Sequence, residues 1–167
     1  MNLLNPFMFA GGGGGTSYTN PLGSGDRTAL MSVSKAAGLT MTGTLTLFID
    51  GAKANGLYFN PAQTVDSSLY IDFDFGTSHL VDEIKFYQSL SADTQGVWEA
   101  LASDDLSGFT SMGSAFTLGG FSGTSNPQII TEVNGNTTPG RYMRIRGVSG
   151  MTNTGPYTIQ FEFKISA

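Results

Sequence analysis

Two stretches of strictly alternating apolar and polar residues constrain the fold of this chain more than any other feature. They are LYIDFDFG, residues 69–76, and YTIQFEFKI, residues 157–165. A period of two is that of a β-strand, and an apolar set on one face indicates that this face is buried. The side chains predicted to point inward are Leu69, Ile71, Phe73, Phe75, Tyr157, Ile159, Phe161, Phe163 and Ile165. Both stretches therefore predict strands with a single buried face.

Five further stretches fit the strand pattern more loosely, and glycine-containing turns punctuate the chain between strands. The stretches are Leu45–Ile49, Glu83–Tyr87, Val97–Ala102, Ile129–Val133 and Arg141–Arg146. The turn signals are Asp50-Gly51, Asn55-Gly56, Gly119-Gly120, Asn134-Gly135 and Pro139-Gly140. No stretch carries an apolar stripe at helical spacing. Many short strands without helices predict an all-β, antiparallel sandwich or barrel.

The composition fits one folded domain and excludes several classes of function. Hydrophobic residues make up 40% of the 167 residues, which is enough for a core. The 8 Lys and Arg stand against 13 Asp and Glu and form no basic stripe, so nucleic-acid binding is not expected. The absence of cysteine excludes disulfides and thiolate metal sites. No stretch is long and apolar enough to span a membrane, so no membrane partner is expected.

The first fifteen residues, MNLLNPFMFAGGGGG, combine an apolar peptide with a glycine run. They lack a basic segment, and Asn5-Pro6 interrupts the apolar run, so they do not have the pattern of a signal peptide. Because a glycine-rich tether is flexible, we expect the peptide to dock into a partner protein. The anchoring side chains would be Leu3, Leu4, Phe7, Met8 and Phe9. The alternatives are a strand that folds back on its own domain and an unstructured tail.

The order of the motifs between Thr44 and Ala167 resembles the discoidin-like, coagulation-factor C-type domain of the galactose-binding-like clan. The motifs are LTLFIDGAKANGLYF, LYIDFDFG, VDEIKFYQS, GVWEALASDD, FTSMG, RYMRIRGVSG and FEFKI. The resemblance implies an antiparallel jelly-roll β-sandwich over residues 45–167, after an anchor and tether (1–15) and a linker that becomes the first strand (16–44). The sequence departs from the family where Leu57-Tyr58-Phe59 replaces its usual tryptophan, and the two family cysteines are missing.

The resemblance also implies a structural calcium ion at the Asp50 turn. Asp50, Asn55 and Glu162 match the family positions, and backbone carbonyls near Phe48 and Ala52 would complete the oxygen ligands that calcium prefers. The alternative is a turn with a local Asp hydrogen bond and an exposed Glu162. No other cofactor is expected.

The resemblance further implies that loops at one end of the sandwich bind a sugar or a lipid. The candidate loop aromatics are Tyr58, Phe59, Phe109, Phe121 and Tyr157. Aromatic rings offer flat apolar faces to sugar C–H groups, while polar side chains fix the hydroxyls. Packing within the fold is the alternative for each ring.

Catalysis is not expected. His79 has no marked nucleophile near it, and a surface histidine is the simpler interpretation. Asp72 and Asp74 would share one strand face, as glycosidase carboxylates sometimes do, but outer-face charges explain them equally well. We expect Arg144 and Arg146 to form cross-strand ion pairs with outer carboxylates, and Trp98 to fill the core.

Together, the anchor peptide, the tether and the sandwich indicate a virion protein of a tailed bacteriophage, on capsid or tail, made in the host cytoplasm. The N-terminal arm would bind other virion proteins. The sandwich would stiffen the particle surface or bind host cell-surface polysaccharide, and homo-oligomers are compatible with its acidic, charge-poor composition. The alternative is a free carbohydrate-binding module or lectin. A hydrolase is the third interpretation and would need turnover that depends on Asp72 or Asp74.

Overall fold

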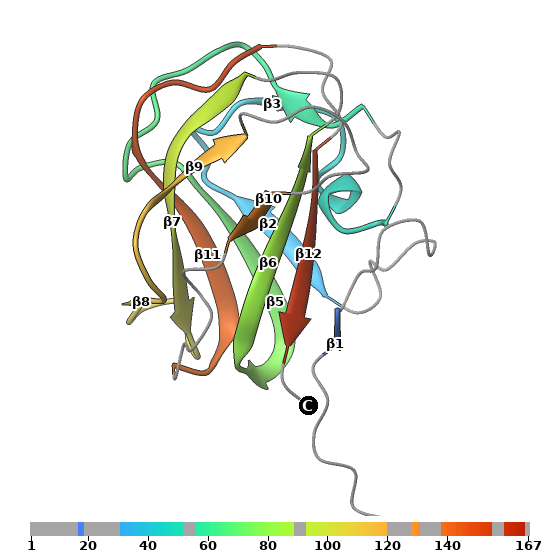
Figure 1. Ribbon diagram of the computed structural model, residues 1–167, viewed down its shortest axis with the longest axis vertical. Helices are drawn as coiled ribbons and strands as arrows, with labels where there is room; N and C mark the ends of the chain where they lie inside the picture. Colours follow the sequence, from blue (N-terminus) through green and yellow to red (C-terminus); the bar gives the residue numbers. More distant parts are fainter. Residues whose placement is uncertain are drawn as a thin grey trace, which may run out of the picture.

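Two antiparallel sheets packed face to face form the molecule (Figure 1). The computed structural model describes residues 17–18, 31–51, 56–88, 93–119, 128–130, 138–154 and 159–165. In spatial order the larger sheet contains β2 (Ser32–Lys35), β5 (Tyr70–His79), β11 (Gly140–Ser149), β7 (Thr94–Ser103) and β8 (Thr110–Ser111), and β9 (Phe116–Gly119) also pairs with β7. The smaller sheet contains β1 (Ser17–Tyr18), β12 (Ile159–Ile165), β6 (Val81–Gln88) and β10 (Gln128–Ile130). The expected all-β antiparallel sandwich is confirmed.

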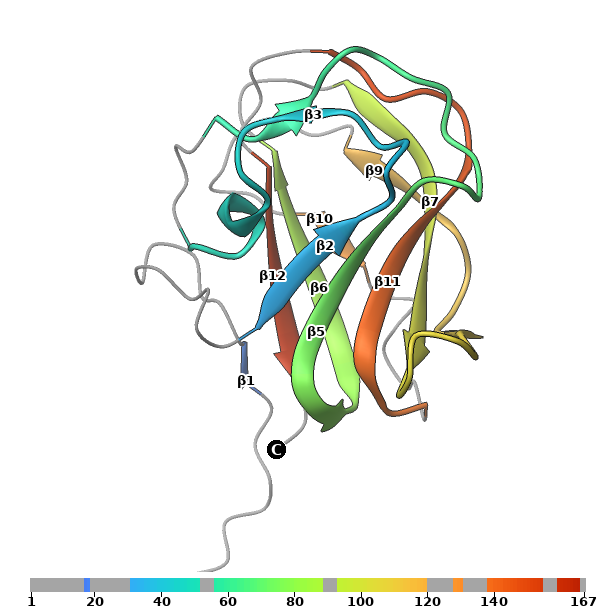
Figure 2. The same ribbon diagram turned by 180° about the vertical axis from the view of Figure 1, so that it is seen from behind.

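A short pair of strands lies at one end of the sandwich. β3 (Met41–Thr42) pairs with β4 (Tyr58–Phe59), and a 3₁₀ helix, η2 (Leu45–Phe48), lies between them in the chain. At the opposite end β1 pairs with the last residues of β12, Ser17 opposite Ile165. Figure 2 shows β2, β5, β11 and β7 from outside, with β3 at one end and β1 at the other. Within the described part of the chain, no helix is long and apolar enough to cross a membrane.

Aromatic rings from both sheets fill the core, as the alternating stretches predict. The rings of Phe73 on β5 and Phe163 on β12 lie 4.7 Å apart, and those of Phe86 and Phe161 lie 5.0 Å apart. Leu69, Ile71 and Phe75 are buried with Phe73, and Ile159 is buried with Phe161 and Phe163. Tyr157 lies outside the described residues. The inward face is therefore confirmed for the described apolar positions up to Phe163, while Ile165 is half-buried.

Trp98 is fully buried on β7, as expected. Its ring stacks on Phe59 at 6.0 Å between centroids, and its Nε1 donates a hydrogen bond to the Gln95 carbonyl at 2.6 Å. Buried indole N–H groups need such an acceptor. The ring therefore joins the β3–β4 pair to the core of the large sheet.

The prediction of a strand over Leu45–Ile49 is wrong, because Leu45–Phe48 forms the 3₁₀ helix η2. The amide of Leu47 donates to the Thr44 carbonyl at 3.0 Å, and the amide of Ile49 donates to the Thr46 carbonyl at 3.1 Å. Phe48 and Ile49 are both fully buried although they are consecutive. A strand would send them to opposite faces, whereas a tight helical turn points both toward the core.

The expectation that β12 buries only one face is also wrong. Gln160 is 0% exposed and Glu162 is 3% exposed, although both lie on the outer face of the small sheet. Tyr87 of β6 lies opposite Gln160, and its hydroxyl donates to Glu162 Oε2 at 3.0 Å. The glutamate is therefore held by a neighbouring strand rather than solvated, so the exposed Glu162 of the simple-turn alternative is not observed.

The other loosely patterned strands are confirmed where the structure describes them. Glu83–Tyr87 lies in β6, Val97–Ala102 in β7 and Arg141–Arg146 in β11. The expected strand over Ile129–Val133 overlaps β10 at Ile129 and Ile130, and its other residues lie outside the described ones. Strands β1, β2 and β3 all lie before residue 45. The sandwich thus includes strands from the segment expected to be a linker that becomes the first strand.

Candidate functional site

The described loops at the β3–β4 end of the sandwich are tied together by hydrogen bonds. We call this region, residues 40–42, 58–69, 93–96 and 147–154, the loop end. The Gln63 amide donates to Thr152 Oγ1 at 3.0 Å, and the Thr152 amide donates back to the Gln63 carbonyl at 2.9 Å. The Thr40 amide donates to Gln63 Oε1 at 3.0 Å. Gln63 therefore joins three segments that are distant in the sequence into one platform.

Close backbone approach at glycines fixes the same platform. A Cβ on Gly147 would lie 2.5 Å from the Asp66 carbonyl oxygen, so the segments of β11 and residues 60–69 touch there without room for a side chain. Gly96 has φ +82, and a Cβ there would lie 2.8 Å from Val65 Cγ2. Only glycine fits such positions without displacing its neighbours. The loop end is therefore a preorganised surface.

Buried amides continue this network beneath the surface. Gln95 is 0% exposed, and its Nε2 donates to Gln88 Oε1 at 3.1 Å. Its Oε1 accepts the Asn153 amide proton at 2.9 Å, and Gln88 Nε2 donates to the Asp93 carbonyl at 3.0 Å. Because buried amides are stable only when they are hydrogen-bonded, this chain fixes the start of β7 and the segment around Asn153.

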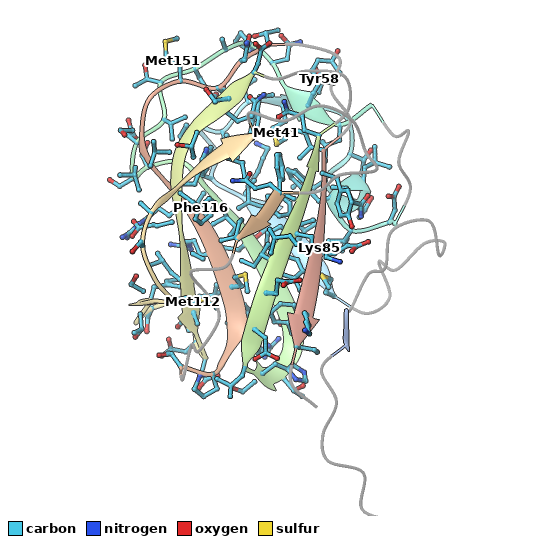
Figure 3. The ribbon with its side chains drawn as sticks, in the orientation of Figure 1. Met41, Tyr58, Lys85, Met112, Phe116 and Met151 are labelled. Carbon is cyan, nitrogen blue, oxygen red and sulfur yellow. The ribbon has the colours of Figure 1, made fainter. Side chains whose placement is uncertain are left out.

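The β3–β4 pair presents two different faces. Thr42 lies directly opposite Tyr58, and Met41 lies opposite Phe59, so each pair shares one face. Phe59 points inward onto Trp98. On the other face Asn60 Nδ2 donates to Thr42 Oγ1 at 3.1 Å, which places Asn60 beside Thr42 and Tyr58. We call Thr42, Tyr58 and Asn60 the β3–β4 face. Figure 3 shows Tyr58 at this end of the molecule.

The three side chains of the β3–β4 face are half-buried and retain hydrogen-bonding capacity. The contact between them uses one Asn60 N–H and one acceptor site of Thr42 Oγ1. The hydroxyl proton of Thr42, the second amide proton of Asn60 and its Oδ1 remain. An aromatic ring next to a mixed set of uncharged donors and acceptors is the chemistry that recognises a sugar.

The outer face of the large sheet carries the charged side chains instead. Arg144 Nε donates to Asp72 Oδ1 at 2.7 Å and its Nη2 to Oδ2 at 2.8 Å. The Arg144 guanidinium lies 3.8 Å from the ring centroid of Tyr70 and 4.0 Å from that of Phe109. Its hydrogen bond to Asp72 raises the pKa of Arg144. Asp72 is only 7% exposed although it lies on an outer face.

Two further ion pairs flank this one. Arg141 Nε and Nη2 donate to the two carboxylate oxygens of Asp74, both at 2.8 Å, and Arg146 Nε donates to Glu99 at 2.8 Å. The hydrogen bond from Arg141 lowers the pKa of Asp74. The cross-strand ion pairs expected for Arg144 and Arg146 are therefore confirmed. We call these three pairs the ion-pair face.

The five candidate ligand aromatics do not form one cluster. Tyr58 lies on the β3–β4 face, whereas Phe59 is 1% exposed and belongs to the core. Phe109 packs on Arg144 of the ion-pair face. The burial of Phe59 agrees with the packing alternative, whereas Phe109 is half-buried and apart from Tyr58, and its role in binding a ligand stays a prediction. Phe121 and Tyr157 lie outside the described residues.

Asp50 and Glu162, two of the proposed calcium ligands, are described, but the third, Asn55, lies outside the described residues. Glu162 is a buried carboxylate on β12, and η2, which leads into Asp50, packs against β12 through Phe48 and Phe161 at 5.5 Å. The described residues contain no group of three acidic, histidine or cysteine side chains that could hold a metal. Phe161 faces the core and Glu162 the outer face of β12, so this contact does not by itself bring Asp50 to Glu162, and calcium binding stays a prediction.

The other sequence candidates have simple structural surroundings. His79 Nε2 lies 3.0 Å from Thr77 Oγ1, and its ring packs on Phe75. Asp72 and Asp74, the possible carboxylate pair, are each bound by an arginine. The anchoring residues Leu3, Leu4, Phe7, Met8 and Phe9 lie outside the described residues.

Sequence reasoning missed Thr42, Asn60 and Gln63. Thr42 and Asn60 flank the early turn at a separation of 18 residues, and Gln63 meets Thr152 across 89 residues. Short polar residues of this kind give no periodic signal. The one available sign was that Asn60 follows directly on the aromatic pair Tyr58-Phe59.

Solved structures similar to this chain include carbohydrate-binding modules of family 32. The module of AlyQ, in complex with 4,5-unsaturated mannuronic acid, is 20% identical, with 79% of this chain and 92% of that chain covered and a TM-score of 0.55. The module of C. perfringens NanJ, in complex with galactose, is 12% identical, with coverage of 89% and 99% and a TM-score of 0.57. No family model and no curated protein matches the chain.

A third module, from a Clostridium perfringens family 89 protein and in complex with GalNAc-β-1,3-galactose, is 16% identical, with coverage of 84% and 99% and a TM-score of 0.56. At these identities the likeness establishes the fold. The chain has the discoidin-like, galactose-binding-like β-sandwich fold, as the order of its motifs indicated.

Proposed function

We propose that this chain is a carbohydrate-binding module that holds a sugar at its loop end. The observation that carries the proposal is the β3–β4 face, where Tyr58 lies beside the hydrogen-bonded pair of Thr42 and Asn60 on a preorganised platform. The fold supports it, because the three neighbouring structures described above contain sugars. Their ligands include an acidic and a neutral sugar, so the fold does not choose between these classes.

A glycan array followed by titration calorimetry tests the proposal. We expect binding of at least one glycan by the full chain, with affinity reduced about fivefold in Thr42→Val, since a lost hydrogen bond costs roughly 1 kcal/mol. Thr117→Val is the matched control, because Thr117 is an exposed threonine on β9. The proposal is wrong if no glycan binds, or if both substitutions weaken binding equally.

Display on a phage particle is a second proposal, favoured by the positions of β1 and the loop end. β1 pairs with the last residues of β12, at the end of the sandwich away from β3 and β4 (Figure 1). A body attached through the residues before Ser17 would leave the loop end facing outward. Deletion of residues 2–15 should preserve the melting temperature and abolish co-sedimentation with particles. Unchanged incorporation of the shortened chain would contradict the anchor.

A further inference from the structure

We propose that the loop end selects an uncharged sugar over an acidic one. This inference rests on the proposed sugar-binding function and concerns only the class of sugar. Two independent observations carry it: the hydrogen-bonding groups of the β3–β4 face, and the distribution of charge over the described residues.

The β3–β4 face offers donors and an acceptor together. Thr42 retains a hydroxyl proton, whereas Asn60 retains both an amide proton and the acceptor Oδ1. A sugar hydroxyl both donates and accepts, so it satisfies both kinds of group. A carboxylate only accepts, so Asn60 Oδ1 would face a second acceptor across the contact. The face is thus complementary to hydroxyls.

Each described cation lies outside the residues of the loop end. Arg141, Arg144 and Arg146 are bound to carboxylates on the ion-pair face. Lys35, at the end of β2, donates through Nζ to the backbone carbonyls of Ala36 and Leu39. The two remaining described cations, Lys85 and Lys164, lie on β6 and β12, opposite Glu162 and Glu83 respectively. Within the described ranges, no arginine or lysine belongs to the loop end.

The described charges of the loop end are acidic. They are Asp66, in the segment between β4 and β5, and Asp93, directly before β7. The Ser68 hydroxyl and amide donate to Asp66 Oδ1, which lowers the pKa of Asp66, and like any ordinary aspartate it is ionised at neutral pH. The Asp66 carboxylate creates a potential that repels an anionic ligand and leaves a neutral one unaffected.

Matched sugar pairs test the inference: methyl galactoside against methyl galacturonide, and methyl glucoside against methyl glucuronide. Within a pair only the C6 group changes, from a hydroxymethyl to a carboxylate. By calorimetry on the full chain at low ionic strength, we expect the acid to bind at least about tenfold more weakly than its neutral partner. The difference in affinity between the acidic and the neutral sugar should decrease at 0.5 M salt, because salt screens exposed charges.

Asp66→Asn provides the matched variant. It should raise the affinity for the acid about twofold and leave the affinity for the neutral sugar unchanged, since it removes charge and keeps an acceptor for Ser68. Equal or tighter binding of the acids overturns the inference but leaves the proposed function standing. Absence of binding for all four sugars and across the glycan array overturns the proposed function, and the inference with it.

Discussion

The ion-pair face and the loop end are both polar surfaces of one sandwich, yet they use polar groups in opposite ways. On the ion-pair face, each guanidinium meets a carboxylate within 2.8 Å, and two aromatic rings enclose Arg144. At the loop end, backbone and amide hydrogen bonds fix the platform. The uncharged side chains of the β3–β4 face keep donors and an acceptor for an external partner.

This comparison separates polar groups that stabilise the fold from polar groups that can still bind a ligand. An ion pair that is nearly buried is worth keeping only if both partners are satisfied, so its groups have little left to offer a ligand. Hydroxyls and amides are cheaper to desolvate and can exchange water for sugar hydroxyls. The four predictions that follow test this separation: the first two measure stability and sugar affinity, and the last two measure stability.

The largest expected effect is on stability and comes from Arg144→Ala. This change leaves Asp72, 7% exposed, without its cation, and breaking a buried pair costs about 3–5 kcal/mol of unfolding free energy. The melting temperature should fall by roughly 6–20 °C, with sugar affinity unchanged at temperatures where the variant is folded. Arg146→Ala is the control, because its pair with Glu99 is more exposed and should cost less than about 1 kcal/mol. If the two variants lost equal unfolding free energy, the nearly buried pair would be no more important for stability than the exposed one.

The second effect is on binding and compares two aromatic residues, both half-buried. Tyr58→Ala should weaken sugar binding about 30-fold, equivalent to roughly 2 kcal/mol, with little change in melting temperature. Phe109→Ala should lower the melting temperature and leave sugar affinity unchanged, because the Phe109 ring packs on Arg144. Calorimetry and thermal unfolding of both variants measure the two effects. Loss of affinity in Phe109→Ala alone would move the site to the ion-pair face.

The third prediction concerns calcium, which we propose binds at Asp50 and Glu162. A structural ion would be another charge used for stability and not for recognition. Calcium at ten times its dissociation constant should stabilise the fold by about 1.4 kcal/mol and raise the melting temperature by roughly 3–6 °C. Magnesium, which demands a tighter octahedral shell, should not do so. The calcium-dependent rise should be absent in Glu162→Gln. A rise that persists in this variant, or no rise in the parent chain, contradicts the proposed ligands.

Local pattern made the sandwich predictable, but not its two exceptions. The alternation from Leu69 to Phe75 is a property of one strand, so their burial can be predicted without knowing what packs on them. Phe48 and Ile49 are consecutive apolar residues, a pattern that a strand and a 3₁₀ turn share. The burial of Gln160 and Glu162 depends on their surroundings in three dimensions, including Tyr87 of β6, which local sequence does not encode.

The candidate site was less predictable because it is built from distant segments. Tyr58 was identified because aromatic residues in loops are conspicuous in a sequence. Gln63 and Thr152 are 89 residues apart, and no periodicity links them. Phe109 follows a loop in the sequence, as expected, but the chain returns it to the sheet and onto Arg144. Sequence thus indicated the kind of site, whereas the set of residues required the fold.

The smallest effect is a pH dependence that contrasts Asp74 with Asp66. The pKa of Asp74 is lowered below its ordinary value of 3.8, chiefly by its hydrogen bond with Arg141. Its contribution to stability is therefore fully present above about pH 4 and is lost as the pH falls through the lowered pKa. Asp74→Asn keeps an acceptor for the Gly76 amide, so the variant isolates the Arg141 contact. Denaturation from pH 6 to pH 2 should show a difference below about 1 kcal/mol that vanishes at the acid end.

Salt then distinguishes the two carboxylates. The Arg141–Asp74 pair joins residues 67 apart on two strands and is partly exposed. At pH 6, 1 M salt should therefore reduce the loss of unfolding free energy caused by Asp74→Asn. The pKa of Asp66 is lowered by the hydroxyl and amide of Ser68, two residues away. This contact contains no cation, so salt should leave the effect of Asp66→Asn on stability unchanged. A salt-sensitive Asp66 would place a cation at the loop end, and the contrast between the two surfaces would then fail.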